Sequence, residues 1–197
     1  MIGKLLPFRR LRLVGTTLSD EALIAACATG DAAATAELVA RHAEALYRFL
    51  GRLRGADARD LDDLLQRTFL EALRGIRSFR GKAAVRTWLF GIAANVVRHH
   101  ARTEARRHNF LNNLRLVDEA PTDTPGDAVE RREVGRRLGA ALEALDDSLR
   151  IPFVMCDVEG LPGSEVARVL NLRQGTLWRR LHEARNRLRK AVAEEGV

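Results

Sequence analysis

The chain of 197 residues has little cysteine and no long apolar run. Its two cysteines, Cys27 and Cys156, lie far apart in apolar segments, so we expect small core residues rather than disulfide partners or metal ligands. This usage favours a reducing, cytoplasmic compartment. No apolar run approaches the ~20 residues that a membrane span needs, and we expect no stable membrane insertion. Residues 1–18 are basic and interrupted, which predicts an N-terminal arm rather than a signal peptide.

Aromatic residues, proline and glycine are also scarce, at 5% aromatics, 5 prolines and 15 glycines, and runs of β-branched residues are nearly absent. Few strand and turn formers remain, so the composition predicts an all-α protein whose core is built from Leu, Ala, Val and Ile. A hydrophobic content of 46% suits one or two compact domains.

Lysine is nearly missing, although the chain is basic. Arg and Lys together number 33 against 26 Asp and Glu, giving a net charge of +7, and the only lysines are Lys4, Lys82 and Lys190. Such a surplus favours a polyanionic partner, and arginine suits phosphate groups and guanine edges. A genome rich in G and C would also favour arginine, but it would not explain why the charge is clustered.

Motifs of enzymes are missing as well. The sequence has no glycine-rich phosphate loop, nucleophile elbow or HExxH motif, and its five histidines show no metal-ligand spacing with Cys, Asp or Glu. We therefore expect no catalysis, no cofactor and no small-molecule substrate.

The first part of the chain predicts a helical domain over residues 19–108. Ser19 or Asp20 can cap a first helix, and Gly30 followed by Asp31 ends it and caps the next. The segment "DLDDLLQRTFLEALRGI" is sharply amphipathic and begins with aspartates, which stabilise a helix N-terminus. The helix that follows opens with an apolar face (Trp88, Leu89, Ile92, Ala93, Val96) and continues as a row of arginines (Arg98, Arg102, Arg106, Arg107). Trp88 is expected in the core, and His42 is expected to pack within its helix face.

Residues 109–128 contain proline, glycine and acidic residues and show no periodic spacing of apolar residues, which predicts a flexible linker. The second domain, 129–197, should begin with one helix through "GAALEALDDSLR". A short apolar helix should follow, with Pro152 in its first turn. Then "GSEVARVL", "NLR" and "QGTLWRRLHEARNRLRK" form a predicted helix-turn-helix. Ala167 allows close helix contact, and Asn171 tolerates the left-handed turn.

The last helix buries one stripe (Leu177, Leu181, Ala184, Leu188) and turns arginines outward. We expect its N-terminal part to enter a major groove, with Gln174, Thr176 and Arg179 near base edges. Arg173, Arg180 and Arg185 would reach phosphates, and Gly175 would permit close approach. The alternative is a solvated arginine face on an ordinary helical hairpin.

Together, these segments resemble the bacterial RNA polymerase sigma factors, namely the extracytoplasmic-function (ECF) group of the sigma-70 family. "DLDDLLQRTFLEALRGIRSFRG" is similar to the family's polymerase-binding stretch, and "VRTWLFGIAANVVRHHAR" to its minus-ten segment. "EGLPGSEVARVLNLRQGTLWRRLHEARNRLRK" is similar to its minus-thirty-five-binding helix-turn-helix. The resemblance implies a region 2-like domain at 19–108 and a region 4-like domain at 129–197.

The resemblance also implies site residues and partners. Core polymerase would contact this chain through its β′ clamp helices and its β flap. The clamp helices would contact Asp60, Asp62, Asp63, Gln66, Phe69 and Leu70. The minus-ten element would contact Ser78, Phe79, Arg80, Lys82, Arg86, Asn95, Arg98 and Arg102. The minus-thirty-five element would contact Arg173, Gln174, Gly175, Thr176, Trp178, Arg179, Arg180, His182 and Arg185. An anti-sigma factor and a location in the bacterial cytoplasm are further expectations.

Some positions depart from the family pattern, among them Arg67, His99, Asp146, Trp178 and Arg179, and they leave the promoter sequence open. Two other interpretations also stay open. The chain could be a conventional helix-turn-helix regulator that acts as a dimer without polymerase. It could also be a helical protein that binds anionic membranes or RNA without sequence preference, which would show steep salt dependence.

Overall fold

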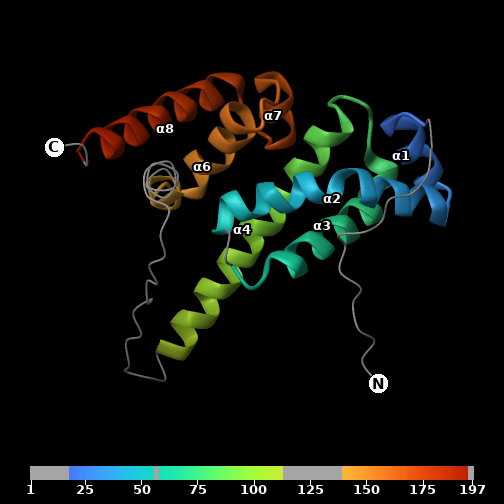
Figure 1. Cartoon of the computed structure of the whole chain (residues 1–197), viewed down its shortest axis with the longest axis horizontal. Helices are drawn as coiled ribbons and strands as arrows, with labels where there is room; N and C mark the ends of the chain where they lie inside the picture. Colours follow the sequence, from blue (N-terminus) through green and yellow to red (C-terminus); the bar gives the residue numbers. More distant parts are fainter. Residues whose placement is uncertain (1–17, 56–57, 113–138, 195–197) are drawn as a thin grey trace, which may run out of the picture.

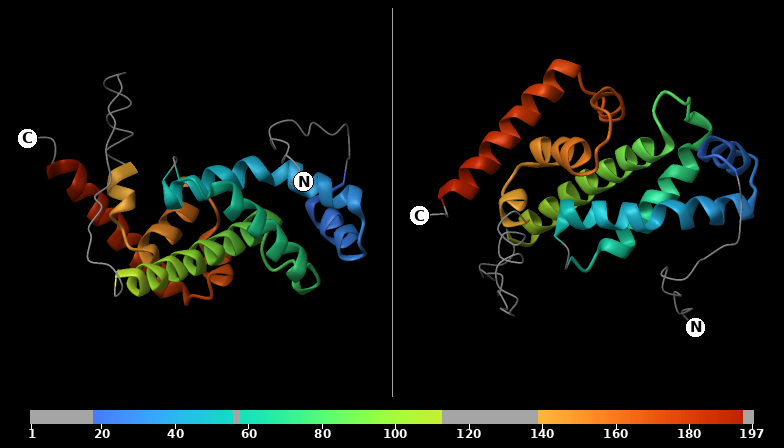
Figure 2. Two further views of the ribbon diagram at one scale, coloured as in Figure 1. Left: turned by 90° about the horizontal axis from the view of Figure 1, so that it is seen from below. Right: turned by 45° about the horizontal axis from the view of Figure 1, so that its top comes forward.

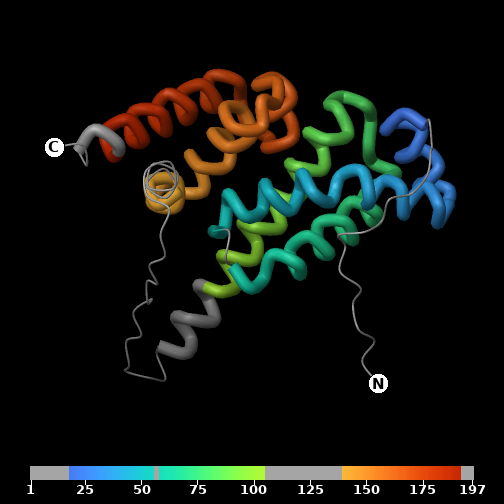
Figure 3. The backbone as a smooth tube through the Cα atoms, in the orientation of Figure 1, coloured from blue at the N-terminus to red at the C-terminus, as the bar shows by residue number. Residues whose placement is uncertain are grey.

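The structure is a computed structural model that describes residues 18–55, 58–112 and 139–194. Within these ranges every regular element is a helix, as the composition predicts (Figures 1 and 3). None of the helices in these ranges combines the length and the apolarity that crossing a membrane requires. The predicted arm and linker lie outside the described residues, except for Leu18 and residues 109–112.

The first two helices, α1 (Asp20–Ala28) and α2 (Ala32–Arg54), begin and end where the sequence predicts. The Ser19 hydroxyl accepts a hydrogen bond from Ala22 N at 3.2 Å and caps α1. Gly30 adopts a φ of 90°, which an L side chain would resist, and lets the chain reverse. The Asp31 carboxylate then accepts hydrogen bonds from the first amides of α2 and caps it.

Helices α3 (Leu61–Gly75) and α4 (Val85–Asn112) complete an N-terminal bundle with α2, and the short helix η2 (Ile76–Ser78) leads into the loop between them. Phe49 of α2 and Phe90 of α4 are both fully buried, with ring centroids 4.5 Å apart. Helix α4 continues four residues past the predicted boundary at 108. The C-terminal half of α4 carries the predicted row of arginines, of which the structure describes the side chains of Arg98 and Arg102.

The C-terminal bundle comprises a helical segment at 139–143, α6 (Asp147–Phe153), the π-helical turn η3 (Val154–Val158), α7 (Gly163–Val169) and α8 (Gln174–Glu194). Two predictions were wrong here. The helix expected through Arg150 breaks at residues 144–146, and α6 starts at Asp147, so Pro152 lies inside α6 and not in a first turn. Proline cannot donate the helical hydrogen bond, and the wider π turn follows directly after it.

The predicted helix-turn-helix is confirmed in α7 and α8. Asn171 has a φ of 53°, the one positive value among the described non-glycine residues, and Ala167 is buried at the helix contact. All four residues of the predicted stripe in α8 are buried: Leu177, Leu181, Ala184 and Leu188. The opposite face of α8 is therefore turned to solvent.

Helix α4 of the N-terminal bundle packs against the C-terminal bundle, with α2 and α3 on one side of it and α7 on the other (Figures 1 and 2). The right-hand view of Figure 2 shows this order again, with α8 on the outside. No pattern in the sequence predicts that the bundles pack on each other. This contact decides which arginines of α4 remain accessible.

Candidate nucleic-acid and protein interfaces

The outer face of α8 presents the residues predicted to contact an upstream DNA element. Arg173, Gln174, Gly175, Arg179 and His182 are exposed, and no atom lies within 4 Å of a Cβ placed on Gly175. Thr176 and Arg180 are half-buried. The position of Gly175 would thus let a nucleic-acid backbone approach the helix closely.

Trp178 on the same face is 51% exposed, and one edge of its indole rests against the start of α7. A Cβ on Gly163 would lie 3.2 Å from that ring, so a larger residue there would require the ring to shift by a few tenths of an ångström. The ring is therefore held beside the recognition face with its other edge free.

Arg185 differs from the other arginines of this face because an acid of its own bundle already binds it. Its Nε and Nη2 donate to the two carboxylate oxygens of Asp157 at 2.7 Å, and this hydrogen bonding raises the pKa of Arg185. Arg173 and Arg179, in contrast, have no ion-pair partner within the described residues. These two are the more available cations for phosphates or base edges.

The second candidate surface follows α4, and the structure divides its predicted residues. Asn95 and Arg102 are exposed, and Arg98 donates to Asn95 Oδ1 at 2.6 Å. Burial lowers the pKa of Arg98, with a further contribution from Arg102. Arg86 donates to Glu159 Oε2 at 2.7 Å and is thereby turned toward the C-terminal bundle.

The loop before α4 exposes Arg80 and Lys82, whereas Phe79 is half-buried against Trp88, with ring centroids 5.2 Å apart. The Ser78 hydroxyl donates to Gly75 O at 2.6 Å and fixes the loop entry. Trp88 is packed on the core but stays half-buried, so it is only partly the core residue that we expected. Phe90 is fully buried and unavailable for base stacking.

Helix α3 turns an acidic and apolar face to solvent. Asp62, Asp63 and Gln66 are exposed, and Leu70 is 48% exposed, which is unusual for a leucine on a helix with a well-formed core face. Phe69 is only 6% exposed and packs in the core, so the structure does not bring it to this surface. The resemblance put Phe69 in the predicted set, but neighbouring residues of a helix lie on different faces, so Phe69 and Leu70 do not share one surface.

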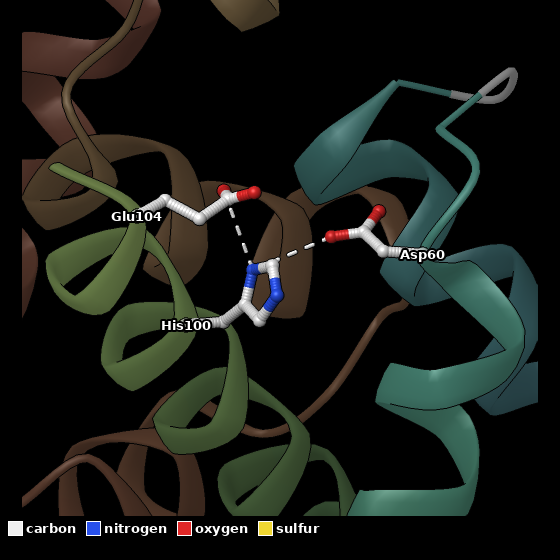
Figure 4. A group of neighbouring side chains, drawn as sticks. All are labelled: Asp60, His100 and Glu104. Carbon is white, nitrogen blue, oxygen red and sulfur yellow. Dashed lines mark ion pairs between the residues drawn. The ribbon is translucent and has the colours of Figure 1, made fainter. Parts of the chain in front are cut away.

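Asp60, also predicted on this surface, instead belongs to a cluster with His100 and Glu104 of α4 (Figure 4). His100 Nδ1 lies 3.3 Å from Asp60 Oδ2 and 3.4 Å from Glu104 Oε2. Sequence reasoning missed this group, although the i,i+4 spacing of His100 and Glu104 was a usable signal.

A histidine with two carboxylates can bind zinc, but the same two oxygens already accept hydrogen bonds from Arg54 Nη2, at 3.2 Å from Asp60 and 2.8 Å from Glu104. The guanidinium supplies the positive charge that a metal would bring. The cluster thus ties the end of α2, the start of α3 and the middle of α4 together.

Comparisons with known proteins agree on one family. Residues 38–107 match Sigma-70 region 2, and residues 135–188 match Sigma-70, region 4. The first match covers α3, the loop and most of α4, and the second covers the helix-turn-helix. The first two segments that suggested the resemblance fall inside the region 2 match, and the third, residues 159–190, falls inside the region 4 match except for its last two residues.

Curated relatives extend over nearly the whole chain. The ECF RNA polymerase sigma factor SigM of Mycobacterium tuberculosis is 35% identical, and the match covers 88% of this chain and 85% of that protein. SigE of Mycolicibacterium smegmatis is 32% identical over 85% of this chain, which spans 66% of that relative's length. The sigma-E factor of Haemophilus influenzae is 28% identical over 89% of this chain and 96% of that protein.

Solved structures share the architecture. CnrH, in complex with the cytosolic domain of CnrY, superposes with a TM-score of 0.62 and 27% identity, covering 90% of this chain and 99% of that one. The Bartonella quintana sigma factor RpoE, in complex with the anti-sigma factor NepR, shares the fold with a TM-score of 0.63 and 20% identity over 80% of this chain and 95% of that one. With these matches in both domains, the chain belongs to the ECF group of RNA polymerase sigma factors, which direct transcription initiation.

Proposed function

We propose that the exposed face of α3 binds core RNA polymerase. Asp62, Asp63 and Gln66 offer carboxylate and amide groups to a basic partner surface, and Leu70 adds an exposed apolar anchor among them. Asp60 supports this face from behind, because its own carboxylate pairs with Arg54 and His100. The β′ clamp helices of the polymerase would contact this face, and its β flap would contact this chain as well.

The two arginine-bearing surfaces then bind promoter DNA. The face of α8 that holds Arg173, Gln174 and Arg179 would contact the minus-thirty-five element in the major groove. The face of α4 and the loop before it, with Arg80, Lys82 and Asn95, would hold the minus-ten element and its separated strand. Base extrusion costs a few kcal/mol, which a basic, shaped surface can offset.

The observation that carries this proposal is the division of charge in space: Asp62 and Asp63 are exposed at the start of α3, whereas exposed basic residues lie in the loop before α4, on α4 at Arg102, and along α8. One protein partner and one polyanion can therefore bind the same chain without competing.

A transcription assay with core polymerase from the same organism and fragments of its genome tests the proposal. We expect discrete start sites that share two sequence elements, absent when either protein is omitted. Arg179→Ala should leave polymerase capture intact and weaken recognition of the upstream element by ~1–3 kcal/mol. Transcripts that start at random, or none from any fragment, would contradict the proposal.

A regulatory protein partner is part of the same proposal. CnrH was solved with the cytosolic domain of a second protein, and the Bartonella sigma factor with an anti-sigma factor. We propose that an anti-sigma factor binds this chain in the bacterial cytoplasm.

A further inference from the structure

A cavity of about 610 Å³ lies where the C-terminal half of α4 faces the C-terminal bundle. Arg98 and Arg102 of α4 line one part of it, and Arg180 of α8 lines another. The start of α6 completes the wall with Asp147 and Ser148. A volume of this size is within the range of small-molecule sites. Three side chains with a permanent positive charge thus share a space that is large enough to hold a small molecule.

No acid neutralises these three arginines. In the part of the chain that the structure describes, Arg98, Arg102 and Arg180 form no ion pair. Burial lowers the pKa of Arg98, and the charge of Arg102 lowers it further. Arg180 acts on this pKa in the same direction, whereas Asp147 opposes them. Like charges that share a partly buried space repel one another, so their convergence is unfavourable unless an anion joins them.

The two acids of the wall already have arginine partners of their own. Asp147 pairs with Arg150, three residues away in α6. Asp146, which precedes α6, is exposed, and its Oδ2 lies 3.8 Å from Arg187 Nη1. The lining therefore carries a surplus of positive charge, which an anion from solution would neutralise.

Contacts between the two bundles fix α4 opposite this wall. The side chain of Glu159 is only 7% exposed, because its carboxylate pairs with Arg52 of α2 and Arg86 of α4. A Cβ on Gly91 of α4 would lie 2.8 Å from Val169 Cβ of α7, so a glycine permits this close approach. The arginines of the cavity therefore project from helices whose spacing is set by packing, which is what a preorganised site needs.

Promoter DNA does not explain why these three arginines meet. In the proposed function, Arg98 and Arg102 contact the minus-ten element and Arg180 contacts the minus-thirty-five element. Those elements lie about 25 base pairs apart, or roughly 85 Å along B-DNA. One promoter cannot contact all three residues while they line one cavity, so the anion that fits them together is a smaller one.

We propose that this cavity binds an anion with two linked phosphate groups, held by Arg98, Arg102 and Arg180. A planar guanidinium donates two parallel hydrogen bonds to phosphate oxygens, and its charge is permanent. Two phosphate groups carry about three negative charges, which match the three arginines. The Ser148 hydroxyl offers a further donor. Side chains supply all of these groups, so the site does not need a glycine-rich phosphate loop.

The recognised chemistry is the diphosphate group itself. None of the described residues that line the cavity is aromatic, so no side chain there offers a surface on which a base would stack. Inorganic diphosphate and nucleoside diphosphates share this group, and both are used as probes.

Isothermal titration calorimetry of the full chain, without DNA or polymerase, tests the site. At constant ionic strength, inorganic diphosphate should bind one site per chain. It should bind at least about tenfold more tightly than orthophosphate, which carries fewer charges and cannot bridge the two helices as well. Arg102→Ala and Arg180→Ala should each raise the Kd for diphosphate at least about tenfold, because each removes hydrogen bonds to a charged group. Circular dichroism should show the same helix content in all chains.

Arg179→Ala is the matched control, because it removes the same charge from the neighbouring residue of α8, which is exposed and does not line the cavity. Its Kd for diphosphate should stay within about twofold of the wild-type value. Equal weakening by Arg179→Ala and Arg180→Ala would show non-specific binding to a basic surface and overturn the proposal. Equal affinity for diphosphate and orthophosphate, or no saturable binding, would overturn it as well.

Titration with ADP distinguishes the two sources of the group. Tighter binding of ADP than of inorganic diphosphate would assign the site to a nucleoside diphosphate, and equal or weaker binding would assign it to inorganic diphosphate. Because the calorimetry uses the chain alone, it decides the site separately from the transcription assay. A chain that bound diphosphate but directed no transcription would refute the proposed function and not the site.

Discussion

Reversing one charge on the exposed face of α3 should separate polymerase binding from folding. Asp63 lies in the first turn of α3, where a negative charge is favoured by about 0.3–1 kcal/mol. Asp63→Arg removes that contribution and adds a similar unfavourable one, a loss of roughly 0.6–2 kcal/mol in the free energy of unfolding. For a chain of this size that lowers Tm by roughly 1–8 °C, so the variant stays folded at 25 °C.

The expected loss of polymerase capture is much larger than this change in stability explains. A like charge facing a basic surface, in place of an attractive one, should weaken binding by at least about 1.4 kcal/mol, or tenfold. Capture of core polymerase on immobilised sigma factor, with a fluorescence titration for Kd, measures it.

The matched control is Asp31→Ala, which removes the cap of α2 and its hydrogen bonds to Ala33 N and Ala34 N. That loss is also about 1 kcal/mol, but it falls at the far end of α2, roughly 30 Å from the start of α3. Asp31→Ala should bind polymerase like the wild type. If Asp63→Arg also did, or if both variants lost binding equally, the assignment of α3 would be refuted.

Two further predictions concern folding. Burial lowers the pKa of His42, although Asp20, whose Oδ2 lies 3.1 Å from His42 Nε2, acts in the opposite direction. As the pH falls, the His42 side chain is therefore protonated in the unfolded chain before it is protonated in the folded one. The free energy of unfolding should thus decrease as the pH drops below about 6.5. Thermal unfolding from pH 7.5 to 5 should show a shallower decline in His42→Gln, and an unchanged slope would exclude His42 as the cause. Because φ is 53° at Asn171, Asn171→Gly should keep the stability of the wild type, whereas Asn171→Val should lower the free energy of unfolding by about 1–2 kcal/mol. Urea unfolding measures both values. Equal losses would show that the turn does not need the left-handed conformation.

Local features of this fold were predictable because near neighbours in the sequence encode them. The stripe of α8 repeats at helical spacing, and Asn171 stands where the turn needs a positive φ. The caps at Ser19 and Asp31 depend on amides two or three residues away. The break at 144–146 was missed because apolar residues continue through it at helical spacing, and this spacing alone does not reveal where a helix stops.

A residue could be assigned to a candidate surface from the sequence only where the spacing along its own helix decides on which side of that helix it lies. Helical spacing alone separates the exposed Asp62, Asp63 and Leu70 from the buried Phe69, which only the resemblance put in the predicted set. Asp60 shows the same limit, because its partners Arg54 and His100 come from other helices.

The contact between the bundles could not be derived from periodicity, since Glu159 meets Arg52 and Arg86 across more than seventy residues of chain. One local signal pointed to it. Gly91 lies inside the long helix α4, where glycine costs about 1 kcal/mol relative to alanine. A glycine kept there at that cost needs a packing reason, and Val169 is that reason. If α4 had only to bind DNA, alanine would serve better at position 91; the glycine is explained by a helix that must also receive α7.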